Sequence, residues 1–266
     1  MDAGPFPGLA NNPVLTAFVA GCVAAGATAA GTLPAMFARR IAQGAQDAMF
    51  GFGAGVMFAA SAFSLVLPGI HAAERAGAGA WSAGGMVGFA ILLGAAVLMI
   101  LERVLPHEHF IKGAEWRHSL RIKRAWLFVF AICLHNLPEG LAIGVGYAGT
   151  DAAHGTALAT GIVIQDIPEG LVVAIALLAT GYRRLFSVAI GMTSGLIEPV
   201  GAAAGAEFVV RFPLVLPGAL GFAAGAMLFV VSHEIIPESH RQGHEHLATG
   251  GFIIGFVMMM LLDTVL

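Results

Sequence analysis

Apolar residues run along this chain in eight long stretches that are separated by short polar segments. A helix needs roughly 20 residues to cross a hydrocarbon core about 30 Å thick, and each stretch has about that length. A transmembrane β-barrel would require shorter segments of alternating polarity, and no stretch alternates. The pattern predicts an all-α polytopic membrane protein, one domain over residues 1–266, with spans at 13–38, 48–70, 81–101, 125–147, 155–181, 185–210, 214–236 and 247–266.

The composition agrees with a membrane protein. Hydrophobic residues make up 58% of the chain and charged residues 11%, and the mean hydropathy is +0.85. Soluble globular domains carry about 25% charged residues, so the expected partner of this surface is the lipid bilayer. The formal net charge of −3 indicates no particular partner, and no basic run suggests nucleic acid.

The basic residues predict the orientation of the spans. If both termini lie on one side of the membrane, 11 of the 13 Lys and Arg residues fall in loops on the opposite side, and only Arg75 and Arg211 do not. Loops rich in Lys and Arg are typical of the cytoplasmic side. We therefore expect a multi-pass protein of the bacterial inner membrane with both termini on the periplasmic side.

Two of the cytoplasmic connections contain histidine. The longest, 102–124, carries His107, His109 and His118, and a later one carries His240, His244 and His246. Histidine clusters can collect metal ions weakly at a surface. Solvated loops without a ligand are the alternative, and the sequence leaves both open.

An internal repeat relates two of the spans. The segment GFGAGVM at 51–57 is similar to GFAAGAM at 221–227, and a proline follows each copy, at Pro68 and Pro237. In the predicted topology the first copy runs outward and the second inward. Inverted repeats are common in transporters, with the substrate site near the membrane midplane. The sequence thus predicts an inverted repeat that relates spans 1–3 to spans 6–8 around spans 4 and 5.

Polar residues interrupt three spans at mid-depth. Span 125–147 contains HNLPEG at 135–140, and span 155–181 contains QDIPEG at 165–170, 30 residues later. Residues i and i+4 share a helix face, so His135 is expected beside Glu139, and Gln165 beside Glu169. Asn136 and Asp166 lie on the other flank of the same glutamates. Span 185–210 adds Glu198, directly before a proline.

The acidic residues in these spans have no Lys or Arg nearby in the sequence that could neutralise them. Glu139, Asp166, Glu169 and Glu198 are acidic, yet no Lys or Arg occurs between residues 124 and 183 or between 184 and 211. A charged group at the centre of a membrane helix costs about 2.5–3.5 kcal/mol on insertion scales. The acids must therefore be protonated or hold a cation. A single buried acid or histidine is commonly a packing residue, but repeated motifs at one depth favour a binding site.

The donor types indicate which cation is bound. Imidazole beside carboxylate and amide oxygens suits zinc, cadmium, iron(II), manganese or nickel better than sodium or calcium. Shared glutamates could hold two ions, with His135 and Gln165 on one flank and Asn136 and Asp166 on the other. Met57 could add a thioether ligand to the first flank, although methionine commonly fills helix interfaces.

A further polar group lies at the inner end of span 214–236. The segment HEIIPE resembles the HExxH motif of zinc proteases, but Pro237 occupies the position of the second histidine, so that catalytic site cannot form. His233, Glu234 and Glu238 are candidate exit-side metal ligands. A polar helix end without a ligand is the alternative.

At HNLPEG and QDIPEG the sequence resembles the ZIP (Zrt/Irt-like) metal transporters, in particular their bacterial GufA-type branch. The resemblance covers essentially the whole chain. It implies a transporter that imports zinc, with cadmium, iron or manganese as further candidate substrates, and not an enzyme with a catalytic cofactor. It implies one metal site formed by His135, Glu139, Gln165, Glu169 and Glu198, and a second formed by Asn136, Asp166 and the shared glutamates. Many relatives have histidine where this chain has Gln165. The resemblance also implies a two-fold homodimer and an elevator-like motion of helices 1, 4, 5 and 6 against 2, 3, 7 and 8.

Three other functions can be weighed against metal transport. An intramembrane metalloprotease would need a complete HExxH motif. A proton- or sodium-coupled carrier of an organic substrate would need basic or aromatic groups in the core of the central spans, where neither is prominent. A metal sensor would normally bring a sizeable soluble domain. The sequence decides neither the driving force nor the physiological metal.

Overall fold

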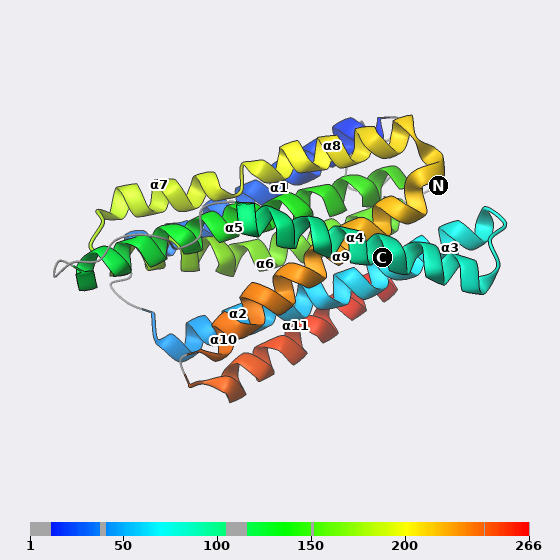
Figure 1. Ribbon diagram of the computed structural model, residues 1–266. Helices are drawn as coiled ribbons and strands as arrows, with labels where there is room; N and C mark the ends of the chain where they lie inside the picture. The colour runs from blue at the N-terminus through cyan, green and yellow to red at the C-terminus, as the bar shows by residue number, and fades with distance from the viewer. Residues whose placement is uncertain (1–11, 38–40, 105–115, 150–151, 242, 266) are drawn as a thin grey trace.

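The computed structural model describes residues 12–37, 41–104, 116–149, 152–241 and 243–265, and these form helices without any strand. Figure 1 shows the helices as one elongated bundle whose members run mostly along its length. The α-helices are α1 (Pro13–Thr32), α2 (Gln43–Ala60), α3 (Leu67–Arg75), α4 (Ala80–Val104), α5 (Trp116–Gly149), α6 (Ala152–Ala179), α7 (Arg184–Ser194), α8 (Ile197–Arg211), α9 (Leu216–Val230), α10 (Ile236–His240) and α11 (Glu245–Val265).

The prediction of a polytopic all-helical membrane protein is confirmed. Within the described residues, seven helical segments are long and apolar enough to cross a membrane: Pro13–Met36, Gln43–Arg75, Ala80–Leu101, Ala153–Ala179, Arg184–Arg211, Pro213–His240 and Glu245–Val265. The remaining predicted span, 125–147, lies inside the 34-residue helix α5. That this helix is an eighth span remains a prediction.

Both ends of the predicted loop 102–124 are helical in the structure. Helix α4 continues to Val104, and α5 begins at Trp116. His118 therefore lies within a helix, while His107 and His109 fall outside the described residues.

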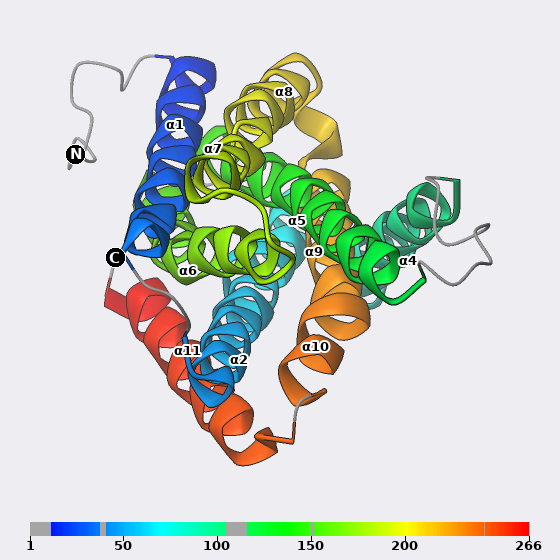
Figure 2. The same cartoon turned by 90° about the vertical axis from the view of Figure 1, so that its left-hand side faces the viewer.

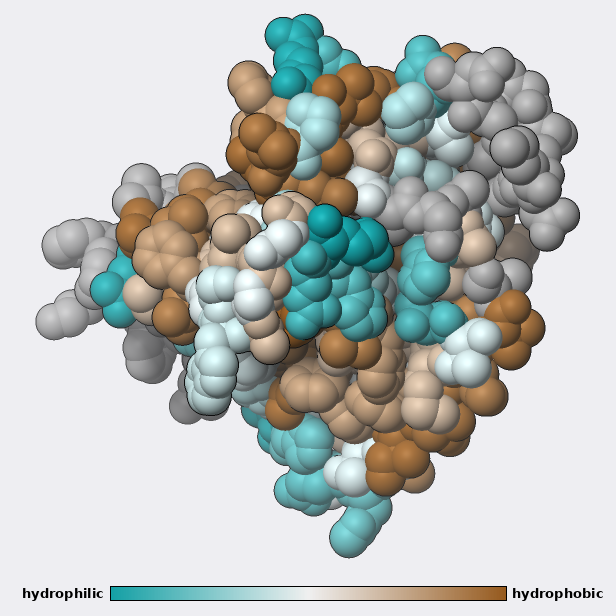
Figure 3. Space-filling view, turned by 90° about the vertical axis from the view of Figure 1, so that its right-hand side faces the viewer, coloured by the Kyte–Doolittle hydropathy of each residue, from teal (hydrophilic) through white to brown (hydrophobic). Residues whose placement is uncertain are grey.

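Large apolar side chains cover the outside of the bundle. Leu92 of α4 is 70% exposed, Leu185 of α7 72% and Ile254 of α11 64%. Such a surface is stable in lipid but would be an aggregation hazard in water. Figure 3 looks onto one end of the bundle, where hydrophilic residues gather and hydrophobic residues lie around them. The distribution fits a bundle whose sides face acyl chains and whose ends face water.

The helices pack in two groups, which Figure 2 shows end-on. The first group consists of α1, α5, α6, α7 and α8, and the second of α2, α3, α4, α9, α10 and α11. Within the first group, Gly144 faces the backbone of Ala202; within the second, Gly55 faces the backbone of Phe252. A side chain at either glycine would collide with a main-chain atom, so these helices approach closely because glycine is there.

Side chains, not closely approaching backbones, form the contacts between the two groups of helices. Each described glycine that closely approaches the backbone of another helix does so within its own group. Across the groups, Gly161 faces the side chain of Met259, and Gly149 faces that of Leu216. Each group is therefore held together by backbone contacts, whereas side chains form the boundary between them.

The two copies of the sequence repeat adopt the same local structure. Helix α2 passes into a π-helical segment, Ser61–Val66, and α9 passes into another, Val231–Ile235. The residue after each segment donates its amide hydrogen to the carbonyl five positions earlier, Leu67 to Ala62 and Ile236 to Val231. Pro68 and Pro237 come next. The extra residue of a π turn relieves the helix just before a proline ring, which would otherwise clash with the preceding turn.

Candidate metal site

The two Pro-Glu-Gly motifs lie inside continuous helices. Pro138 is within α5, and Pro168 is within α6. A proline inside a helix has no amide hydrogen to donate, so the carbonyls of Leu134 and Ile164 lose their helical partners. Each motif therefore combines a local weakness in the helix with polar side chains on the adjacent turns.

The glycine of each motif fixes a neighbouring helix. Gly140 packs against the backbone of Glu198 on α8, and Gly170 packs against the backbone of Thr28 on α1. A side chain at either glycine would overlap main-chain atoms. The same motif position therefore brings α8 to α5 and α1 to α6.

Glu198 lies at a break in the predicted span 185–210. Helix α7 ends at Ser194, and α8 begins at Ile197. Pro199 cannot donate to Gly195, whose carbonyl instead accepts a hydrogen bond of 3.0 Å from the amide of Glu198. The carboxylate is thereby held in the first turn of α8, where the helix dipole favours negative charge.

Three residues of the two motifs form a first cluster. His135 Nε2 lies 3.4 Å from Glu139 Oε1 and 3.4 Å from Glu169 Oε2. Two ligands held about 2.1 Å from a tetrahedral zinc ion stand about 3.4 Å apart, so these separations fit a shared ion. Gln165 donates from its amide to Glu139 Oε1. The structure thus brings together four of the five residues that the resemblance assigns to this site, whereas the fifth, Glu198, groups with Glu139 and Asp166.

A second cluster shares Glu139 with the first. One ligand atom from each of Glu139, Asp166 and Glu198 lies within 4.8 Å of the others, and all three residues are fully buried. Asn136 donates from Nδ2 to the carbonyl of Ser194 at 3.1 Å. That bond directs its oxygen away from the Ser194 carbonyl and leaves it available as a further donor to a cation.

Several buried nitrogen and oxygen atoms of both clusters have no hydrogen-bond partner among the described residues. Among the described residues, buried atoms without a hydrogen-bond partner include His135 Nδ1 and Nε2, Asn136 Oδ1, Glu139 Oε2, Asp166 Oδ2, Glu169 Oε1 and Glu198 Oε2. Buried polar atoms in folded proteins are almost always paired, because an unpaired one costs about 1–3 kcal/mol. A concentration of unpaired acceptors is what a cation site requires, and each cluster offers two or three anionic groups to a divalent ion.

A small cavity lies beside the first cluster. A cavity beside Glu169 is lined by Met49, Phe50, Gly53, Ile132, Gln165, Pro168, Glu169, Val172 and Ile235. Val172 and Ile132 lie about one turn from the motifs, toward the ends of α6 and α5 that the sequence predicts to be cytoplasmic. The cavity thus lies on the predicted inner side of the candidate metal ligands.

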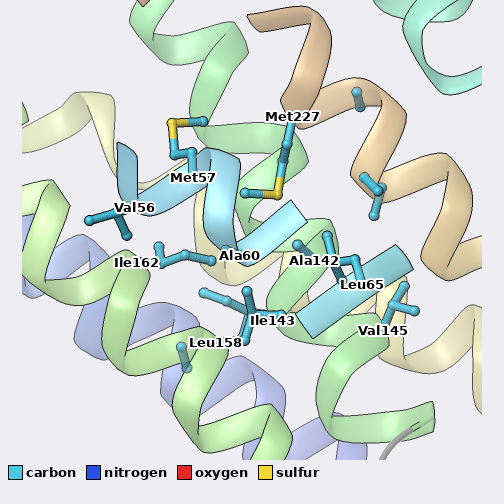
Figure 4. Packing of buried hydrophobic residues seen from close by; sticks show 14 of the residues in the cluster. Val56, Met57, Ala60, Leu65, Ala142, Ile143, Val145, Leu158, Ile162 and Met227 are labelled. Atoms are coloured by element: carbon cyan, nitrogen blue, oxygen red, sulfur yellow. The ribbon is translucent and has the colours of Figure 1, made fainter. Parts of the chain in front are cut away.

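Apolar side chains pack between the site and the predicted outer side of the membrane. Ile143 follows Glu139 by one turn on α5, and Ile162 precedes Asp166 by one turn on α6. Figure 4 shows both with Leu158 and Ala60 in the packed core between α2, α5 and α6. All four are fully buried. This plug would keep water and ions from reaching the site from the predicted outer side.

Met57 lies in this packed core. Its side chain is 1% exposed and belongs to the same apolar cluster as Met227. The helix that carries it does contact the site, because Gly53, one turn earlier, faces the amide oxygen of Gln165. A ligand role for the Met57 sulfur remains a prediction.

The three candidate exit-side ligands lie at the end of the second π segment and the start of α10. His233 stacks on Phe229 with ring centroids 5.1 Å apart. Glu238 forms an ion pair of 2.8 Å with Arg241. Glu234 is partly buried. Metal binding by these residues remains a prediction.

Three contacts of the site and its surroundings were not foreseen from the sequence. The hydroxyl of Thr28 donates to Glu198 Oε1 at 3.3 Å, and Ser194 offers its carbonyl to Asn136. At the predicted cytoplasmic side, His244 Nδ1 lies 2.9 Å from the buried carboxylate of Asp47. A threonine in an apolar helix and a serine beside a helix break carry no signal that distinguishes them from packing residues.

Comparison with known proteins identifies the family. Residues 109–263 match the family described as ZIP Zinc transporter. The chain is 48% identical to zinc transporter ZIPB of Bordetella bronchiseptica over 250 residues, which cover 94% of this chain and 81% of that protein. The chain belongs to the ZIP family of zinc transporters. It is also 41% identical over 245 residues to zinc transporter GufA of Myxococcus xanthus, covering 92% of this chain and 96% of that protein.

Membership of the ZIP family confirms the resemblance seen at the two motifs. A third relative, zinc transporter ZupT of Akkermansia muciniphila, is 33% identical over 272 residues, 95% of this chain and 98% of that protein. ZIP proteins are transporters and not enzymes, so the protease alternative is rejected. The family does not favour a carrier of organic substrates.

Proposed function

We propose that this ZIP protein carries Zn²⁺ across the bacterial inner membrane into the cytoplasm, through the site formed by α5, α6 and α8. The observation that carries the proposal is the pair of buried clusters that share Glu139 and have unpaired oxygen atoms. The relatives that match most of the chain are zinc transporters by name. Cadmium, iron(II) and manganese are further candidate substrates, and the imidazole of the first cluster favours zinc over manganese there.

Alternating access is proposed from the two helix groups. Backbone contacts at glycines hold each group together, and side chains form the boundary between them, so the groups can slide past one another as two bodies. An elevator-like motion of α1 and α5–α8 against the remaining helices would carry the site across the apolar plug. The cavity beside Glu169 corresponds to an inward-facing state in this scheme.

An inverted repeat would supply the two states. The matched π segments of α2 and α9, and the matched glycine contacts of α5 and α6, support a two-fold axis in the membrane plane between the halves. Periplasmic termini follow from the distribution of basic residues. A homodimer through the apolar outer faces completes the proposed assembly.

Protons are proposed to replace the metal in the return step. Metal ligands must be deprotonated to coordinate, so metal binding releases protons from the acids. A loaded site and a protonated empty site are both nearly neutral, and either can cross a low-dielectric barrier at tolerable cost. Zinc flux measured against an imposed pH gradient at fixed zinc tests this step. No response to the gradient would leave facilitated movement without coupling.

The direct test of the proposed function uses purified protein in metal-free proteoliposomes with a zinc-sensitive dye inside. Zinc added outside should enter only when the protein is present, and calcium or magnesium should not compete at similar concentration. Correctly folded protein that passes none of zinc, cadmium, iron and manganese would overturn the proposal.

A further inference from the structure

Glu198 is held from α1 by a residue outside the motifs. The Thr28 hydroxyl donates to Glu198 Oε1 at 3.3 Å and also lies 3.3 Å from the carbonyl of Ala24 in its own helix. Thr28 and Glu198 are both fully buried. The second carboxylate oxygen, Oε2, has no hydrogen-bond partner in the described part of the chain. One oxygen of Glu198 is therefore fixed, and the other remains available to a cation.

The position of Thr28 matches that of Glu198 across the two motifs. Gly140 of the first motif packs against the backbone of Glu198, and Gly170 of the second packs against the backbone of Thr28. The two residues are thus counterparts on α8 and α1, and they meet each other through their side chains. One counterpart supplies a carboxylate to the second cluster, and the other supplies the donor that orients it.

Gly195 leaves the space in which this contact forms. A Cβ atom there would lie 2.9 Å from Glu198 Oε1, 3.0 Å from Thr28 Oγ1 and 3.0 Å from Thr28 Cβ. Such distances require one of the neighbours to move. The break between α7 and α8 therefore places a glycine where any side chain would disturb the hydrogen bond.

From these contacts we propose that Thr28 is a positioning residue of the second cluster. Its hydroxyl holds one carboxylate oxygen of Glu198 and leaves Oε2 for a cation shared with Glu139 and Asp166, and this arrangement sets the zinc affinity of that cluster. The inference rests on the proposed function and assigns to α1 a role that its apolar sequence does not reveal. Orienting groups around metal ligands typically change metal affinity by about 10- to 100-fold.

The test compares Thr28→Val with Thr28→Ser in equilibrium zinc binding and in uptake by proteoliposomes. Valine keeps the branched shape but lacks the donor, so zinc affinity at the second cluster and the KM for uptake should each worsen by about tenfold. Serine keeps the hydroxyl and should restore both. Gly195→Ala should resemble Thr28→Val, since it disturbs the same bond from the other side.

Thr32→Val is the matched control. Thr32 is also fully buried on α1, but within the described part of the chain its hydroxyl donates only to the carbonyl of Ala29 in its own helix. Its substitution should leave zinc affinity and KM unchanged. Thermal melting of each variant in detergent verifies that the protein is folded.

A double-mutant cycle gives the decisive comparison. If Thr28 acts through Glu198, Thr28→Val should add nothing to the defect of Glu198→Gln. The positioning role would be overturned if Thr28→Val changed zinc affinity equally in the wild-type and Glu198→Gln backgrounds. It would also be overturned if Thr28→Val had the zinc affinity and KM of the wild type. Neither result would contradict metal transport. Normal uptake by both Glu139→Gln and Glu198→Gln would instead overturn the proposed site itself.

Discussion

His135 on α5 and Glu169 on α6 meet across the two proline-containing helices, with Nε2 of the imidazole 3.4 Å from Oε2 of the carboxylate. Glu139 approaches the same nitrogen to the same distance from within α5. A hydrogen bond from the imidazole would normally be shorter, with nitrogen and oxygen about 2.9 Å apart. The wider spacing is that of two ligands of one tetrahedral ion.

His135→Gln should weaken zinc binding more than manganese binding. Imidazole favours zinc over manganese, whereas amide and carboxylate oxygens do not, so zinc affinity should fall about 10- to 100-fold and manganese affinity much less. Competition titration of purified protein with the two metals measures the ratio. An equal loss for both metals would argue that His135 serves only the structure.

The shared position of Glu139 predicts unequal effects of two glutamate substitutions. If the two clusters hold one ion each, Glu198→Gln should remove one zinc ion per protein and leave one, whereas Glu139→Gln should weaken both sites by more than about 100-fold. Calorimetric titration reports the stoichiometry. Glu207→Gln on α8 is the control, because Glu207 is exposed and pairs with Arg211 outside the clusters. The same stoichiometry in all three variants would contradict the two-cluster arrangement.

The α2–α11 contact predicts a difference between two glycines. Gly55→Ala would place a methyl group against the Phe252 and Phe256 backbone, whereas Gly250 on α11 has open space around it. Crowding a packed interface costs about 1–3 kcal/mol, so Gly55→Ala should lower the melting temperature in detergent. Gly250→Ala should not. A Gly55→Ala protein as stable as the control would show that these helices can separate at no cost.

The cavity and the apolar plug predict access from one side only. In a variant without Cys22 and Cys133, the natural cysteines, Val172→Cys should react with a membrane-impermeant thiol reagent applied to inside-out vesicles in metal-free buffer. Leu158→Cys, in the buried core, should react from neither side. Reaction of Leu158→Cys from the periplasmic side, with Val172→Cys protected, would show that the empty protein faces outward.

Much of the site follows from the sequence because membrane depth restricts what polar groups can do. His135, Glu139, Gln165 and Glu169 could be assigned to one face by helical spacing, and the lack of Lys or Arg nearby made a bound cation the expected partner. The structure brings these four side chains together as the spacing predicts.

Other parts depend on tertiary contacts that no local pattern contains. The hydrophobic run 185–210 predicts one continuous helix, but Pro199 leaves the Gly195 carbonyl without its usual donor, and the helix breaks there. The role of Thr28 depends on α1 and α8 meeting at the motif glycines. The ends of the predicted loop 102–124 are helical because polar and basic residues are as compatible with a helix that extends beyond the membrane as with a loop.

Zinc uptake by proteoliposomes containing wild type, Glu139→Gln or Glu207→Gln tests the central claim most directly. Wild type and Glu207→Gln should take up zinc at the same rate, and uptake by Glu139→Gln should fall to the level of protein-free liposomes. Uptake by a folded Glu139→Gln protein at the wild-type rate would contradict the account, because the residue shared by both clusters would then have no part in transport.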